Sequence, residues 1–410
     1  MQKAIKNIFS NLKSKFFGKK DSEYAFLASV ISILVGFILA ILVLFVLEFA
    51  KADSDYSKPL LGIKNFFTYS FNSTSAFAKI FYNAAPLMLT GLAVGFAFKA
   101  GLFNIGATGQ YSIGAFFALI AAILWQYPWW AALIVAIVAG AIWGSIPGIF
   151  KAFFNINEVI TSIMLNWAAL YMIRLIFFNL KEINTIQSDR TNDLSLANPS
   201  AIIPDAGLGE LFNTSFINMG IIIALLVAII IYIVLEKTVF GYEIKACGLN
   251  RNASLYAGVK AKKTIIMTML ISGALSGLAG GIVYLAGTVQ YTTEIRLLAM
   301  GFNGIPVALL AYSNPLGIIL SSVFIGFLES SGTGFQGLYS TEMTGIIVSV
   351  IIYFSAFSLI VSILIKNTIK KAQEKLALIK VNATKEESES SKDFKEVEKE
   401  EVPDKKGDEV

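Results

Sequence analysis

Histidine is absent from the 410-residue sequence, and cysteine occurs once, as Cys247. Without histidine the chain has no Ser-His or Cys-His nucleophile pair, no imidazole zinc site and no histidine proton relay. One cysteine cannot form an intrachain disulfide. The sequence also lacks a GxxxxGK[ST] phosphate loop, since Gly18 and Lys19 have no glycine at the upstream position. We therefore expect a protein that is not an enzyme, binds no metal or cofactor, and does not hydrolyse ATP itself.

Charged residues are also scarce: they make up 15% of the chain, against 56% hydrophobic residues and a mean hydropathy of +0.68. Long apolar runs follow one another, which is typical of an all-α, polytopic helical membrane protein. Because these runs are continuous, the short alternating strands of an outer-membrane barrel are excluded. The net charge of +5 is small, so we expect no nucleic-acid partner.

The hydropathy pattern predicts about ten membrane spans. They cover residues 24–47, 80–98, 101–124, a fourth run ending near 150, 159–178, 219–235, 265–287, 298–312, 316–331 and 344–365. The first run is too long for a signal peptide, so we expect it to stay uncleaved. An even number of spans places both termini on one side of the membrane.

The distribution of Lys and Arg identifies that side. Basic residues gather in 1–20, at Lys99, at Lys151 and throughout 236–264, which predicts that these segments and both termini are cytoplasmic. The basic segment 1–24 is expected to act as a positive flank that fixes the orientation, with contact to anionic membrane lipids as the alternative. The membrane domain covers 25–365, and the Lys/Glu-rich tail 366–410 is predicted to be disordered.

The third predicted span, GLFNIGATGQYSIGAFFALIAAIL, carries polar side chains inside an apolar run, namely Asn104, Thr108 and Gln110. Polar groups without partners are costly in hydrocarbon, so these should face protein or solute. Asn166 and Asn303 add further amides in other spans. Together the five residues are predicted to line a translocation path for a hydroxylated or amide-bearing solute. The alternative is interhelical hydrogen bonding that only holds the bundle together.

Two short segments are similar to one another: 102–104 reads Leu-Phe-Asn and 301–303 reads Gly-Phe-Asn, each before small residues and an apolar run. This similarity predicts two halves of like construction, with the solute path between them. The glycines of segment 272–287 are expected to permit close helix packing, with a hinge as the alternative.

Ionisable and capping residues occur at the ends of several spans. Asn157 and Glu158 begin the fifth span, where they are expected to cap the helix, with gating as the alternative. Glu329 and Arg174 lie near predicted outer span ends, where we expect them to reach or pair at the membrane interface.

The basic segment GYEIKACGLNRNASLYAG, residues 241–258, is predicted to contain a short helix capped by Asn250. A helix this short does not persist alone, so it must dock on something. The surface is either another subunit or the chain's own cytoplasmic face. The residues assigned to this contact are Gly241, Glu243, Gly248, Asn250, Arg251, Asn252, Tyr256 and Gly258.

The phrases FNIGATGQ, NEVITSIMLN, GLNRNASLYAGV and GFNGIPVA, taken in order, resemble the permease family of ABC importers for branched-chain amino acids, ribose-type sugars and nucleosides. The resemblance covers residues 80–365 and is strongest to the nucleoside branch linked to basic membrane proteins. Thr108 departs from that branch, which usually carries Glu there. The resemblance implies a cell-membrane permease with several partners: ATPase subunits docked on 241–258, a second permease subunit and an extracellular substrate-binding lipoprotein.

Two other functions remain open from the sequence. The same type of importer could carry branched-chain amino acids or ribose-like sugars. An ion-coupled secondary transporter is a rival from another class, but it is expected to carry Asp, Glu or His relays at mid-depth. This chain has no histidine and no Asp in the middle of a span.

Overall fold

The computed structural model describes residues 21–49 and 57–368. The sequence-based expectations for the basic segment 1–20 and for the tail beyond 368 lie outside these residues. The chain forms two compact units, and the larger one, Ser29–Leu359, contains the helix bundle. The described parts of the other unit, 21–28 and 360–368, are helical.

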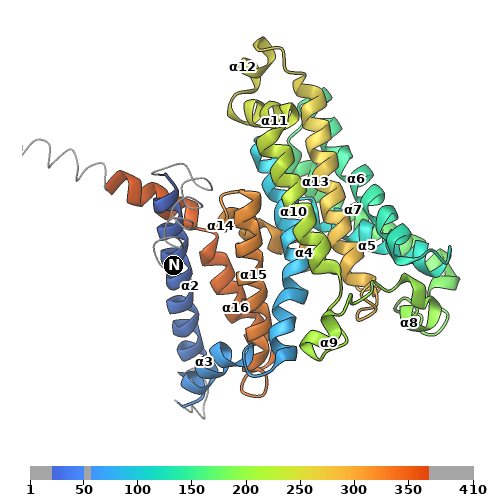
Figure 1. Cartoon of the computed structure of the whole chain (residues 1–410), viewed down its shortest axis with the longest axis vertical. Helices are drawn as coiled ribbons and strands as arrows, with labels where there is room; N and C mark the ends of the chain where they lie inside the picture. The colour runs from blue at the N-terminus through green and yellow to red at the C-terminus, as the bar shows by residue number, and fades with distance from the viewer. Residues whose placement is uncertain (1–20, 50–56, 369–410) are drawn as a thin grey trace, which may run out of the picture. The chain divides into compact units, whose positions relative to one another are not determined.

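Helices account for the architecture (Figure 1), and the described residues form no β-sheet, only isolated bridges at Arg190–Thr292 and Gln336–Tyr339. Within these residues, the eight helices that are long and apolar enough to cross a membrane are α2 (Asp21–Phe49), α4 (Thr74–Lys99), α6 (Trp129–Phe154), α7 (Glu158–Asn179), α10 (Gly220–Lys237), α13 (Ala261–Tyr284), α15 (Pro315–Gly332) and α16 (Thr341–Ser355), which resumes over 358–368. Shorter apolar helices are α5 (Ala107–Ile123) and α14 (Ala299–Leu310). The connecting helices are α3 (Ser57–Tyr69), α8 (Leu194–Ala197), α9 (Leu208–Phe212), α11 (Val239–Leu249) and α12 (Arg251–Tyr256), with 3-10 turns η1 (Lys181–Ile183), η2 (Pro199–Ala201) and η3 (Thr333–Phe335).

Each of the ten predicted spans coincides with one of these apolar helices, so the predicted all-α membrane fold is confirmed. The third span is shorter than predicted. It begins at Ala107 and not at Gly101, because Gly101 adopts a positive φ of 70° and the chain up to Gly106 is irregular. That conformation is accessible to glycine at little steric cost, and it separates the end of α4 from the start of α5.

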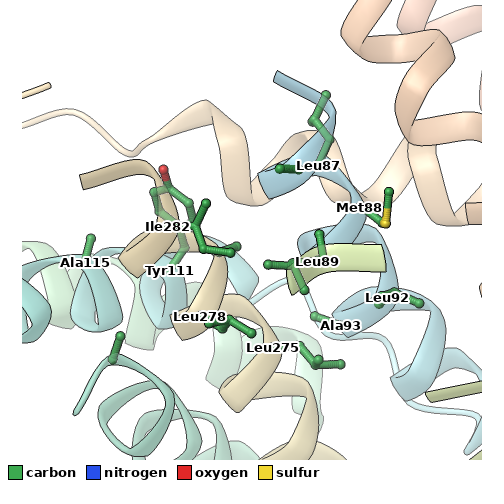
Figure 2. Close-up of a cluster of buried hydrophobic side chains, with 14 of the residues drawn as sticks. Leu87, Met88, Leu89, Leu92, Ala93, Tyr111, Ala115, Leu275, Leu278 and Ile282 are labelled. Atoms are coloured by element: carbon green, nitrogen blue, oxygen red, sulfur yellow. The ribbon is translucent and has the colours of Figure 1, made fainter. Parts of the chain in front are cut away.

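Helices α4 and α13 form the centre of the bundle. Within their most apolar windows 83% and 72% of residues are buried, against 22% for α2, so α2 lies at the periphery. Figure 2 shows Leu89 and Ala93 of α4 in one cluster with Leu275 and Leu278 of α13 and Tyr111 of α5. A helix buried on most sides is largely apolar, and the polar residues that recur along α13, Thr264, Thr268, Ser272 and Ser276, are small and buried.

The two halves of the bundle, α4–α6 and α13–α15, exchange their first helices. α4 packs mainly against α14 and α15, whereas α13 packs mainly against α5 and α6. The first helix of each half therefore contacts the second and third helices of the other half. This arrangement agrees with the predicted pair of similar halves.

Glycines allow α6 and α13 to touch through their backbones. A Cβ atom at Gly273 would overlap Gly140 O, and one at Gly277 would overlap Ala136 O. On the α6 side, a Cβ at Gly144 would come within 2.7 Å of Gly273 Cα. The prediction that the α13 glycines permit close packing is confirmed.

Several helix ends meet at one end of the bundle, which we call the Lys99 face. Lys99 Nζ donates to Tyr312 O at 3.4 Å, and Gly101 packs against Gly248 of α11. Ser29 of α2 and Ser358, just after α16, lie at the same place, because Ser29 Oγ donates to Leu310 O at 3.2 Å and Tyr312 Oη donates to Ser358 O at 2.8 Å. The Lys99 face thus gathers the loop between α10 and α13 with the two ends of the larger unit.

Candidate functional site

The irregular segment before α5 is held by amide hydrogen bonds. Asn104 Nδ2 donates to Gln110 Oε1 at 2.9 Å and to Ser272 Oγ at 2.7 Å, and Gln110 Nε2 donates back to Asn104 Oδ1 at 3.2 Å. Ser272 Oγ in turn donates to Ala93 O of α4 at 2.6 Å. Asn104 and Gln110 are each 1% exposed. These two amides therefore connect α4, α5 and α13 and are enclosed by protein.

Asn166 of α7 forms hydrogen bonds with the backbone at the start of α5. Its Oδ1 accepts from Gly109 N at 2.8 Å, and its Nδ2 donates to Ile105 O at 3.0 Å. The first N–H groups of a helix have no partner within the helix, so this side chain supplies one from a neighbouring helix. Thr108 lies on the same turn, fully buried where Gly301 of α14 approaches.

The structure thus brings four of the five predicted path residues together around the start of α5. The fifth, Asn303 on α14, lies apart from them: its Nδ2 donates to Glu329 Oε1 of α15 at 2.9 Å. Both residues of this pair are half-buried. Sequence reasoning assigned Glu329 to the membrane interface and missed this partner, because nothing in the spacing of two residues on separate helices signals their contact. The role of all five residues as a path lining stays a prediction.

Removing the Asn166 amide should destabilise the bundle. In Asn166→Ala the buried Gly109 N–H and the Ile105 C=O lose their partner, at about 1–3 kcal/mol each, so we expect a loss of about 2–6 kcal/mol. The measurement is the thermal unfolding midpoint in detergent. Asn179→Ala is the matched control, since Asn179 is an exposed asparagine on the same helix whose Nδ2 bonds only Leu175 O. Equal midpoints for the two variants would show that Asn166 has no structural role.

The start of α7 is capped by Asn157 and paired by Glu158. Asn157 Oδ1 accepts from Val159 N at 2.8 Å. Glu158 is the first helical residue, and its Oε2 lies 2.9 Å from Lys151 Nζ at the end of α6. The carboxylate is only 11% exposed, so the pair joins α6 and α7 at a semi-buried site. A gating role for either residue is untested.

In the loop between α10 and α13, several of the residues assigned to an ATPase contact hold the loop in place. Gly241 packs on the backbone at the end of α10, and Gly248 packs on the end of α4. Glu243 Oε2 accepts from Thr264 Oγ1 at 3.4 Å, and Asn250 caps α12 by accepting from Ala253 N at 3.0 Å. Arg251 Nη1 reaches Asn155 Oδ1 in the α6–α7 turn at 3.3 Å.

Other residues of this loop point into solvent. Tyr256 is 95% exposed, Leu249 89% and Leu255 52%, and Asn252 is exposed beside them. Gly258, with φ of 85°, ends the turn after α12. Large apolar side chains displayed on a capped helix are an unusual surface for a free-standing loop. Figure 1 shows α12 at the tip of the bundle near the start of α13, with α11 beside the upper turns of α13.

The bundle consists of apolar helices, and the short helices α5 and α14 each have hydrogen-bonded amide side chains near their starts. This arrangement is typical of a multi-pass membrane transport protein. The chain belongs to the family described as branched-chain amino acid transport system / permease component, which matches residues 76–356. The predicted resemblance is confirmed, and the chain is a transport subunit, not an enzyme.

Named relatives cover most of the chain. It is 32% identical to the nucleoside ABC transporter permease protein NupB of Lactococcus lactis, over 83% of this chain and 93% of that protein. It is 35% identical to the guanosine ABC transporter permease protein NupP of Bacillus subtilis, over 81% and 93%. It is 31% identical to the glucose ABC transporter permease protein TsgB13 of Haloferax volcanii, over 66% and 72%. No solved structure matches the chain.

Proposed function

We propose that this chain is the permease subunit of an ATP-driven importer and forms the translocation path for nucleosides. The observation that carries this proposal is its 32% and 35% identity, over 83% and 81% of the chain, to permeases named for nucleosides and guanosine. The amides at the starts of α5 and α14 agree with a neutral solute that both donates and accepts hydrogen bonds.

The ATPase contact is the exposed part of the loop between α10 and α13. Asn250 fixes the start of α12, and the contacts of Gly248 and Arg251 fix its position against α4 and the α6–α7 turn. The exposed side chains of Leu255 and Tyr256 then form an apolar knob for a cleft in an ATPase subunit. Closure of the ATPase dimer would move α12 as a rigid body together with the helices that it contacts.

The Lys99 face is the cytoplasmic side of the cell membrane in this proposal. It carries Lys99 and adjoins the basic loop, as the positive-inside rule requires. The basic residues of 1–20 support a cytoplasmic position for both chain termini by the same rule. A second permease subunit and an extracellular substrate-binding lipoprotein complete the assembly, and ATP is bound only by the ATPase subunits.

A sugar importer is the second candidate, because a permease named for glucose is 31% identical over 66% of the chain. An ion-coupled transporter that works alone has less support, since the chain belongs to a family of permease components of multi-part systems.

The test is uptake by the reconstituted complex. The chain, its ATPase, the second permease and the binding lipoprotein are placed in proteoliposomes, and uptake of labelled guanosine is measured. We expect uptake that requires ATP and is insensitive to ionophores. Unlabelled nucleosides should compete, whereas glucose and leucine should not. Competition by glucose alone would support the sugar candidate, and uptake by the isolated chain without nucleotide would overturn the proposal.

A further inference from the structure

The residues predicted to line the path differ in whether their polar atoms already have hydrogen-bond partners. Around the start of α5, both amide atoms of Asn104, Gln110 and Asn166 are engaged in hydrogen bonds, and each side chain is at most 2% exposed. A solute cannot bind these atoms without breaking bonds that hold α4, α5, α7 and α13 together. In this conformation the three amides form a structural joint, whereas Thr108 Oγ1 is buried there without a hydrogen-bond partner.

The Asn303–Glu329 pair has the opposite character. The single hydrogen bond between the two side chains uses Asn303 Nδ2 and Glu329 Oε1. Asn303 Oδ1 and Glu329 Oε2 accept no hydrogen bond from any residue within 21–49 and 57–368, and neither is a fully enclosed atom. The two hydrogen-bonded side chains therefore present two further acceptor oxygens on a half-buried surface.

The position of this pair inside the membrane domain needs an explanation. No Lys or Arg of the described chain forms an ion pair with Glu329. A carboxylate facing lipid without a partner is strongly disfavoured, and ionisable residues within spans usually face a cavity or a path.

The helices that carry the pair are held rigidly. Gly301, near Asn303, lies against the backbone of Thr108, and Gly326, one turn before Glu329, lies against α4 with its Cβ position 2.6 Å from Ile80 O. Backbone contacts of this kind leave little freedom for either helix to shift. The two oxygens are consequently presented in a defined geometry, as a binding site requires.

We infer that Asn303 and Glu329 form the membrane-embedded contact for the transported solute and accept hydrogen bonds from a pair of its donors. This inference rests on the proposed nucleoside function and specifies the part of the nucleoside that is bound. Two adjacent acceptors fit the vicinal hydroxyls of a ribose ring. A carboxylate also repels the carboxylate of an amino acid, so the pair favours neutral, hydroxyl-bearing solutes over branched-chain amino acids.

The experiment compares guanosine with 2′,3′-dideoxyguanosine in the reconstituted importer, both at saturating concentration so that the binding protein is loaded with each. In Glu329→Gln one acceptor oxygen becomes an N–H donor. We expect the maximal guanosine uptake rate to fall about tenfold or more, while the rate for the dideoxy compound changes less than about twofold, because a site that bonds a hydroxyl discriminates strongly by that bond. Asn303→Ala should change the two rates in the same sense.

Arg174→Gln is the matched control, since it neutralises another ionisable side chain within a span and should leave both rates at the wild-type level. Unfolding midpoints and ATPase activity establish that each variant complex is assembled. An equal fall for both solutes in Glu329→Gln and Asn303→Ala, or no fall in either variant, would overturn the inference. A wild-type complex that imports no nucleoside would instead refute the proposed function.

Discussion

Tyr256→Ala is expected to reduce ATP-driven uptake about thirtyfold or more while the protein still inserts and folds. The side chain is 95% exposed, so its removal costs the isolated chain almost nothing. If it enters an ATPase cleft, truncation removes a buried aromatic anchor that typically contributes about 2 kcal/mol or more, equivalent to about thirtyfold in affinity. The measurements are uptake and ATP hydrolysis by the same reconstituted complex.

Tyr353→Ala provides the control for this variant. Tyr353 is 62% exposed but lies on α16, so the same substitution should leave uptake unchanged. Arg251→Ala should have a smaller effect than Tyr256→Ala, because Arg251 contacts Asn155 of its own chain. If Tyr256→Ala imports at the wild-type rate, α12 does not transmit the motion of the ATPase.

Gly273→Ala should prevent the bundle from packing. The added methyl group would overlap the backbone of α6 at Gly140, so α6 and α13 must separate along their length. Overpacking of a core costs about 1–3 kcal/mol when side chains can adjust, and a backbone cannot adjust as a side chain does. We expect at least about 3 kcal/mol of destabilisation, visible as loss of the monodisperse peak in detergent and a lower unfolding midpoint.

Gly345→Ala is the matched substitution with the opposite expectation. Gly345 lies within α16 and is exposed, and a Cβ atom added there would meet no other atom within 4 Å. At this position the methyl group only restricts the unfolded chain and improves helix propensity, so stability should rise by about 0.5–1 kcal/mol. Equal behaviour of the two alanine variants would mean that the α6–α13 contact is looser than the structure shows.

The sequence was sufficient to predict the ten apolar helices, because hydropathy alone defines each apolar run. The family motifs were sufficient to predict the class of protein, whereas connecting helices such as α3 and α9 were not predicted. The shortness of α5 was visible only in retrospect, in the cluster of Gly101, Asn104 and Gly106 before it. Polar residues within apolar runs were rightly singled out as unusual. Which of them form hydrogen bonds within the bundle was not predictable, because the partners are distant in the chain. Asn104, for example, bonds Ser272, which lies 168 residues further along.

The same limitation explains the missed partner of Glu329. In the sequence, Glu329 lies near a predicted span end, where a carboxylate can be solvated by water and needs no protein partner. Its contact with Asn303 depends on the angle between α14 and α15, which hydropathy does not determine. Likewise, the bond of Arg251 to Asn155 depends on the position of the α6–α7 turn, which hydropathy does not determine, while its contact with an ATPase subunit stays a prediction.

The exchange of first helices between the halves has a consequence for biogenesis. While α4 and α5 are being inserted, α13, α14 and α15 have not yet been synthesised, so Asn104 lacks its Ser272 partner and α4 lacks the helices that bury it. The nascent N-terminal half must therefore remain with the insertion machinery, or with a membrane chaperone, until α15 is complete. Chains truncated after α10 should be degraded, because long-range contacts of this kind form only when the distant segment arrives.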